Sequence, residues 1–131
     1  MTPPPPPFDA LWFRLLAGTI VGLALGSFVT MLSWRLPRRM SIVTPRSHCP
    51  KCREVLGARD LVPVLSWVAS GGRCRYCGTK IGVRYPLIEL ATAAASMAAF
   101  ALIGFRPLLV AALAGIVAFI SCVAIFIERK H

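Results

Sequence analysis

Three long apolar runs constrain the fold of this chain more than any other feature. Residues 15–34 and 108–127 carry no charged side chain, and residues 86–105 carry only one, Glu89. An α-helix rises about 1.5 Å per residue, so a run of about 20 residues can cross the hydrocarbon core of a bilayer. The sequence therefore predicts an α-helical integral membrane protein with three transmembrane helices.

Prolines and a tight turn indicate where these helices begin and end. Pro37 follows the first run and Pro86 opens the second. Proline at a helix start costs no hydrogen bond, whereas inside a helix it breaks one. Residues 104–107 form a connection so short that the second and third helices should be an antiparallel hairpin. We expect a proline-rich tail, a transmembrane helix, a loop domain, two more transmembrane helices and a short tail at residues 1–14, 15–36, 37–85, 86–105, 108–127 and 128–131.

Positive charge is concentrated in the loop domain. The chain has 15 Lys and Arg against 5 Asp and Glu, a formal net charge of +10, and 11 of the basic residues lie between Arg35 and Tyr85. The positive-inside rule places this loop in the cytoplasm and the N-terminal tail outside. Attraction to anionic membrane lipid accounts for the same charge, so nucleic-acid binding is the weaker interpretation. A hydrophobic content of 56% excludes a disordered chain.

Two Cys-x-x-Cys pairs in the loop indicate a metal site. Their thiols belong to Cys49, Cys52, Cys74 and Cys77. Four thiolates complete a tetrahedral zinc site with no open position, so we expect a structural zinc in a zinc-ribbon-like domain, without His48 as a ligand. Gly78 suits the positive φ of such a turn, whereas Arg53 lacks that advantage. Two disulfides are an alternative that a reducing cytoplasm disfavours. One redox pair is another, and the presence of two pairs in one small loop favours metal over it.

Small residues recur along one face of each predicted helix. The three stripes are Gly18, Gly22, Gly26 and Thr30 in the first, Ala91, Ala95 and Ala99 in the second, and Ala114, Ala118 and Cys122 in the third. Such stripes let membrane helices approach closely, so they predict a compact bundle or docking to a partner, and they carry no catalytic signal. Cys122 is expected to be a small packing residue.

Four motifs of the loop and its borders resemble one family. They are Arg-Ser-His-Cys-Pro-Lys-Cys at 46–52, Pro-Val-Leu-Ser-Trp at 63–67, Gly-Arg-Cys-Arg-Tyr-Cys-Gly at 72–78 and Arg-Tyr-Pro-Leu-Ile-Glu-Leu at 84–90. The motifs follow one another in the same order in the N-terminal domain of prepilin peptidases, the type IV leader peptidase/N-methyltransferases. The chain resembles that domain over about residues 18–95. The resemblance implies a multi-pass protein of the bacterial inner membrane with its zinc loop in the cytoplasm.

The resemblance also implies an activity. That family cleaves the leader of prepilins of type IV pili, or of pseudopilins of type II secretion, and methylates the new amine with S-adenosylmethionine. Its peptidase uses two aspartates of a later region, one in a Gly-x-Gly-Asp motif. This sequence has no such motif, and Asp9 and Asp60 are predicted on opposite sides of the membrane. Glu128 falls near the place of the family's first aspartate but would have no carboxylate partner, so we expect no peptidase activity from this chain alone.

Glu89 and Arg84 are the remaining candidate site residues. An ionisable residue at the mouth of a span is a functional candidate by default, so Glu89 is predicted either to contact the substrate or methyl donor or to pair with Arg84. Arg84, with Arg35, Arg73 and Arg75, could hold phosphate or carboxylate groups, although solvated interfacial charge is the simpler interpretation.

The sequence leaves three functions open. The favoured one is an N-terminal module of prepilin processing that either binds prepilin or pseudopilin or completes a separate Gly-x-Gly-Asp peptidase subunit, with N-methylation as a further activity open to it. A second is a non-enzymatic, membrane-anchored zinc-binding scaffold. The third is a fragment of a full bifunctional prepilin peptidase. None of the three assigns a catalytic residue.

Overall fold

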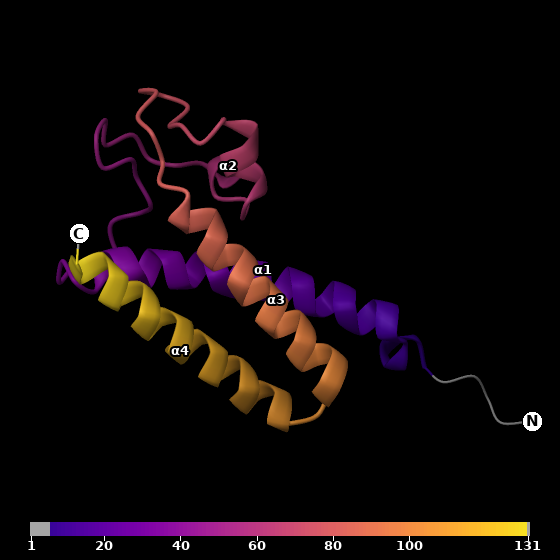
Figure 1. Cartoon of the computed structure of the whole chain (residues 1–131). Helices are drawn as coiled ribbons and strands as arrows, with labels where there is room; N and C mark the ends of the chain where they lie inside the picture. Colours follow the sequence, from indigo (N-terminus) through magenta and orange to yellow (C-terminus); the bar gives the residue numbers. More distant parts are fainter. Residues whose placement is uncertain (1–5, 131) are drawn as a thin grey trace, which may run out of the picture.

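A computed structural model describes residues 6–130, so the first five residues of the expected tail and His131 lie outside the described residues. Three long helices, α1 (Leu11–Arg35), α3 (Arg84–Ile103) and α4 (Leu108–Lys130), form a bundle, and the loop between α1 and α3 folds over one end of it (Figure 1). All three helices are long and apolar enough to cross a membrane. The predicted architecture of three membrane helices with one loop domain is confirmed.

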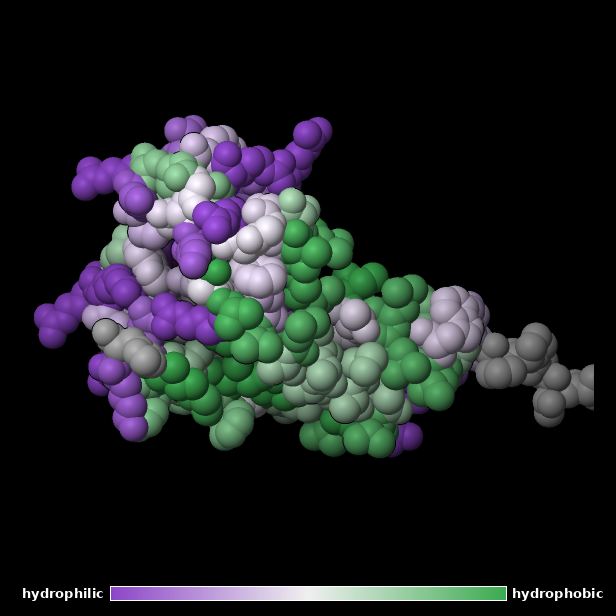
Figure 2. All heavy atoms as spheres, turned by 45° about the horizontal axis from the view of Figure 1, so that its top comes forward, coloured by the Kyte–Doolittle hydropathy of each residue, from purple (hydrophilic) through white to green (hydrophobic). Residues whose placement is uncertain are grey.

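The loop domain contains little regular structure. Its helical elements are η2 (Ala58–Asp60) and α2 (Leu65–Ala69), and η1 (Pro7–Asp9) precedes α1 at the far end of the molecule. In Figure 2, hydrophilic side chains gather on the loop domain and the adjoining helix ends, while hydrophobic surface covers the helices. This division is the one expected when helices lie in lipid and the loop domain meets water.

Glycines of α1 bring α1 and α3 into backbone contact. A Cβ atom on Gly22 would lie 2.5 Å from Cα of Ala93 and 2.8 Å from Cβ of Ser96. A Cβ atom on Gly26 would lie 2.7 Å from Cα of Glu89. No larger residue fits at either position without moving a helix, so the glycine stripe sets the distance between α1 and α3.

Of the other two predicted stripes, only Ala99 of α3 is buried in this bundle, where it joins the apolar cluster with Phe100. The face of α3 against α1 carries Glu89, Thr92, Ala93, Ser96 and Phe100, whereas Ala91 is exposed. The predicted stripe of α4 is exposed along its length, and α4 instead buries Leu109, Ser121 and Ala124. Cys122 is therefore not a packing residue within this bundle. Polar Thr92 and Ser96 turn toward the glycines because the opposite face of α3 meets apolar surroundings.

The turn between α3 and α4 lies at the end of the bundle away from the loop domain. Gly104 ends α3 with a φ of 69°, which favours glycine. The rings of Phe100 and Phe105 pack edge to face with centroids 5.5 Å apart, and buried Leu109 joins Phe100 in an apolar cluster. The expected antiparallel hairpin is therefore present.

Candidate metal centre and adjoining cavity

Two short hairpins carry the four loop cysteines, and they share one hydrogen-bond pattern. In the first, the Cys49 N–H donates to the Glu54 carbonyl (2.9 Å), and the Arg53 N–H donates to the Cys49 carbonyl (2.9 Å). The second hairpin repeats this pattern with Cys74, Thr79 and Gly78. Each turn brings the two thiols of its pair to the same side of the hairpin.

Both turns place one residue in the left-handed region of backbone space. Gly78 has a φ of 69°, which glycine adopts freely. Arg53, at the corresponding place in the first hairpin, has a φ of 60°, at a cost of about 1–2 kcal/mol for a residue with a Cβ. The first turn therefore forms around an arginine in spite of this cost.

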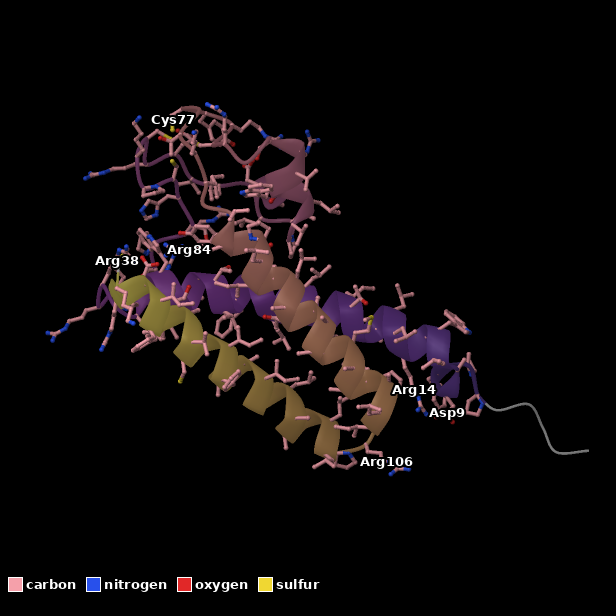
Figure 3. All side chains as sticks on the ribbon, viewed as in Figure 1. Asp9, Arg14, Arg38, Cys77, Arg84 and Arg106 are labelled. Carbon is pink, nitrogen blue, oxygen red and sulfur yellow. The ribbon has the colours of Figure 1, made fainter. Side chains whose placement is uncertain are left out.

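The four thiols converge on one point. The Sγ atoms of Cys49, Cys52, Cys74 and Cys77 all lie within 4.8 Å of one another, and those of Cys49 and Cys77 are 3.8 Å apart. Zinc binds thiolates at about 2.3 Å in a tetrahedron, which separates the sulfurs by about 3.8 Å. The donors and their spacing fit a tetrahedral metal ion, and no histidine or carboxylate joins them in the described part of the chain. The group lies on the loop domain near the labelled Cys77 (Figure 3).

The thiols influence one another's ionisation. Burial opposes ionisation of Cys49, but hydrogen bonds from the N–H groups of Cys52 and Lys51 and from two neighbouring thiols lower its pKa to about 6. The Glu54 N–H favours the thiolate of Cys52, but partial desolvation and the other three thiols raise the pKa of Cys52 to about 12. The raised pKa of Cys52 opposes its ionisation without a metal, so binding a metal there would release a proton.

Asp60 fastens the second hairpin to the rest of the loop domain. Its Oδ2 accepts a hydrogen bond from the Tyr76 hydroxyl (3.2 Å), and its Oδ1 lies 3.4 Å from Nε of Arg75. The charge of Asp60, together with this hydrogen bond, raises the pKa of Tyr76. Asp9 pairs with Arg14 near the start of α1, at the other end of the molecule (Figure 3). The two aspartates are far apart, and each has a structural partner.

Arg84 pairs with Glu128 and not, as the sequence analysis allowed, with Glu89. The Glu128 carboxylate accepts hydrogen bonds from Arg84 and from Nη2 of Arg38 (2.7 Å), and its side chain is only 8% exposed. Arg38 follows α1, Arg84 begins α3 and Glu128 lies in the last turn of α4, so this cluster joins the loop-side ends of all three helices (Figure 3). No local pattern marks it, because its members are far apart in the chain.

Replacing Glu128 should loosen the loop-side end of the bundle. The variant Glu128→Gln leaves Arg38 and Arg84, 42% and 39% exposed, without their shared carboxylate. Because both guanidinium groups reach solvent, we expect a loss of about 1–2 kcal/mol rather than the larger penalty of a fully buried pair. Thermal unfolding of the detergent-solubilised protein measures this, with Glu54→Gln, at an exposed glutamate outside the cluster, as control. Equal stabilities of the two variants would argue against the cluster.

Glu89 supports an unusual turn of the loop domain. Its buried side chain lies in the second turn of α3, and its Oε2 accepts a hydrogen bond from the Val64 N–H (2.7 Å). Val64 has φ 59° and ψ −51°, and the Leu65 N–H donates to the Pro63 carbonyl (2.5 Å), so these residues form a γ-turn. This conformation is strained for a β-branched residue. Glu89 therefore holds a strained turn in place, a role that the sequence reasoning missed.

Arg35 is buried, so its interpretation as solvated interfacial charge is wrong. Its Nη1 donates to the Ser41 carbonyl (2.7 Å) and its Nη2 donates to the Pro45 carbonyl (2.6 Å), and the residue is 5% exposed. The two-pronged guanidinium satisfies two backbone carbonyls at once. Arg35 therefore directs the chain as it leaves α1.

A cavity of about 520 Å³ lies between the loop domain and the loop-side ends of α1 and α3. Its walls come from α1, from both hairpins and from α3. Among the lining residues are Ser27, Trp34, Cys49, Cys74, Arg84 and Glu89. The structure thus brings both non-cysteine candidates, Arg84 and Glu89, to one cavity that is also lined by one cysteine of each pair.

Residues 20–103 match the family described as Bacterial Peptidase A24 N-terminal domain. The prepilin leader peptidase/N-methyltransferase of Myxococcus xanthus is 51% identical over 73 residues, which cover 56% of this chain and 22% of the relative. The protein of the same name from Burkholderia pseudomallei is 39% identical over 116 residues, covering 70% and 38%. The type 4 prepilin-like proteins leader peptide-processing enzyme of Escherichia coli is 40% identical over 99 residues, covering 62% and 37%. No solved structure matches the chain.

The match extends over most of the functional geometry described above. It runs from α1 through both hairpins and the cavity to the end of α3. The chain spans only about a fifth to two fifths of the length of these relatives. The matched residues nevertheless make up well over half of this chain, which therefore belongs to the bacterial peptidase A24 N-terminal domain family.

Proposed function

We propose that this chain takes part in prepilin processing at the bacterial inner membrane, as a module that binds the substrate. The family and the relatives named prepilin leader peptidase/N-methyltransferase support this role. The concentration of positive charge in the loop domain favours a cytoplasmic position for it, with the N-terminal tail outside. The substrate is a prepilin of a type IV pilus or a pseudopilin of type II secretion.

The metal is proposed to be a structural zinc held by Cys49, Cys52, Cys74 and Cys77. An all-sulfur set of four ligands suits zinc and leaves no position for a catalytic water. Its task is to keep the two hairpins, and with them one wall of the cavity, in place. Chemistry on the substrate would take place beside the metal rather than on it.

The cavity is the observation that carries the proposal. It lies where a polypeptide leaving the membrane would meet the loop domain, and it combines side chains of α1 with the charged groups of α3. The Val64 N–H occupies one carboxylate oxygen of Glu89, and the other makes no hydrogen bond within the described residues. That oxygen would receive the amine of a processed pilin or the cationic end of S-adenosylmethionine. Arg84, besides its ion pair with Glu128, would hold a carboxylate group.

Cleavage of the leader is proposed to depend on a peptidase region with a Gly-x-Gly-Asp motif. These 131 residues contain no such motif, and Asp9 and Asp60 are engaged at opposite ends of the molecule. An aspartyl peptidase needs two carboxylates close enough to share a proton. We therefore assign substrate binding, and an environment for N-methylation, to this chain.

Photocrosslinking from the cavity tests substrate binding. The photoreactive residue p-benzoylphenylalanine replaces Trp34 on the cavity wall or, as matched aromatic control, Phe119, which is 71% exposed on α4. Each variant is reconstituted with prepilin in lipid nanodiscs and irradiated. We expect a crosslinked prepilin from position 34 and none from position 119. Equal yields from the two positions, or no crosslink at all, would remove the support for a binding cavity.

Mass spectrometry separates methyl transfer by this chain from substrate binding alone and from a scaffold. Intact prepilin and pre-cleaved pilin are incubated with the zinc-loaded protein and S-adenosylmethionine, and we expect the intact prepilin to remain uncut. A methylated N-terminus on the pre-cleaved pilin would assign methyl transfer to this chain. Crosslinking without methylation would leave a binding module, and failure of both would leave a zinc-binding scaffold. Cleavage of intact prepilin would contradict the division of labour proposed here.

A further inference from the structure

One stretch of the loop domain differs from the rest in charge. Residues 61–72 carry no ionisable side chain, within a loop that holds most of the basic residues of the chain. Trp67 turns inward, and its Nε1 donates a hydrogen bond to the Ile81 carbonyl (3.1 Å). The exposed side chains of this stretch are large and apolar: Leu61 (42%), Val62 (42%), Leu65 (68%) and Val68 (63%). The stretch therefore presents an uncharged, apolar face outward.

One end of this apolar face lies beside the membrane-spanning part of α1. Leu61 and Pro63 border a groove of about 390 Å³ whose other wall is α1 around Ala24. Ala24 precedes Arg35, the last residue of α1, by about 16 Å along the helix axis. Ile20, on the same wall, is 60% exposed. In Figure 2, hydrophobic surface reaches from the helices onto one side of the loop domain. The start of the stretch, at Leu61 and Pro63, thus lies alongside α1 well below its loop-side end.

Apart from the short helix α2, this segment is not helical, so at this depth its backbone donors need other partners, because lipid offers none. Several of its N–H groups donate to carbonyls of residues 58–64, namely those of Leu61, Leu65, Ser66 and Val68. The Val64 N–H, in the γ-turn, donates instead to the Glu89 carboxylate (2.7 Å), and a charged acceptor makes the stronger hydrogen bond. Glu89 lies about 7 Å along α3 from its first residue, Arg84. The turn and the carboxylate therefore meet inside the membrane-spanning part of the bundle.

We propose that residues 61–69 form a membrane-inserted segment. Their apolar face enters the leaflet on the loop side, acyl chains cover it, and the carboxylate of Glu89 anchors the γ-turn. Lipid is the occupant because the face is uncharged and continuous with exposed apolar residues of α1, such as Ile20. The strained Val64 conformation and the buried Glu89 side chain then have one common explanation. Leu61, Ser66 and Trp67 also line the cavity proposed for prepilin, but contact with lipid is measured without prepilin and is therefore tested apart from substrate binding.

A depth-sensitive label tests where the segment lies. Val68 is replaced by p-azidophenylalanine and coupled to a nitrobenzoxadiazole dye in the zinc-loaded protein, in nanodiscs whose lipids carry a doxyl quencher on the acyl chain. A label at Val43, a valine of the basic part of the loop that is 80% exposed, is the matched control, and a label at Ile20 is the lipid reference. We expect quenching at 68 similar to that at 20 and several-fold stronger than at 43. A label at Val62 repeats the test.

Two outcomes would overturn membrane insertion. One is quenching at 68 and 62 no stronger than at 43. The other is a blue-shifted emission at 68 without quenching, because protein rather than lipid would then cover the face. The anchor is tested with Glu89→Ala, which removes the acceptor of the Val64 N–H and should reduce quenching at 68 several-fold with zinc content unchanged. Glu89→Gln keeps an acceptor oxygen and should retain the quenching, and retained quenching in Glu89→Ala would refute the anchor.

Discussion

Replacing Cys74 with serine is expected to empty the metal site and unfold the loop domain while the long helices remain. Between residues 37 and 83 only Cys49, Gly72 and Cys74 are buried, and the two hairpins are closed by isolated bridges rather than a sheet. So little buried apolar surface cannot offset the entropy of ordering this chain. Zinc contributes about 10–16 kcal/mol in small domains of this kind, so we expect nearly all of the fold to be lost with it.

Metal analysis and limited trypsin digestion measure this loss. Wild-type protein should hold about one zinc per chain and resist trypsin in the loop, whereas Cys74→Ser should hold none and be cut at the loop's many Lys and Arg residues. The matched control is Cys122→Ser, because Cys122 is exposed on α4 and outside the thiol group. It should keep both the metal and the resistance to trypsin. A chelator should reproduce the Cys74→Ser pattern in the wild type, and a Cys74→Ser protein that still binds one zinc would contradict the site.

The long helices and the four-thiol group were predictable because each is indicated by residues that lie close together in the sequence. A run of about 20 apolar residues needs no knowledge of its neighbours to be recognised as a span. A two-residue gap between cysteines likewise favours a turn that points both thiols in the same direction. Two such pairs in one short loop are therefore expected to form a single metal site. Neither prediction depends on which distant parts of the chain come into contact.

The packed face of α3 was not predictable in the same way. Alanines lie all around this helix, so small size does not single out one side of it. The predicted stripe of Ala91, Ala95 and Ala99 was no better marked than its neighbours, and only Ala99 of the three is buried. The contrast lies instead in polarity, since Thr92 and Ser96 are fully buried against α1. In an alanine-rich membrane helix, the few hydroxyl groups are a better guide to the contact face than the small residues.

The charged groups depended on contacts between distant parts of the chain. Arg84 and Glu89 sit near each other in sequence, which made a local ion pair plausible, but each finds a partner elsewhere. Glu128 pairs with Arg84 because the hairpin of α3 and α4 brings the end of α4 beside the start of α3. The Val64 N–H donates to Glu89 because the loop domain folds back onto α3. The positive φ of Val64 could not be predicted from the sequence, because a β-branched residue such as valine rarely adopts it.

Replacing Gly22 with valine is expected to force α1 and α3 apart. The new Cβ would lie 2.5 Å from the Ala93 Cα, and Thr92 and Ser96 leave no space on either side. These atoms belong to the backbone and to a short side chain, so they cannot give way without moving a helix. Overpacking of this kind costs about 3 kcal/mol or more. Thermal unfolding in detergent should show the loss, and hydrogen exchange should speed up in the facing turns of both helices.

Gly115 separates the effect of packing from the effect of the residue type. It lies in α4 with no atom within 4 Å of where its Cβ would be, so Gly115→Val makes the same chemical change without a clash. Gly22→Ala and Gly115→Ala extend the comparison, because alanine favours a helix over glycine by about 1 kcal/mol. Stability should therefore fall for Gly22→Ala and stay level or rise for Gly115→Ala. Changes of the same sign at both positions would mean that helix propensity, and not backbone contact between α1 and α3, governs the glycine stripe.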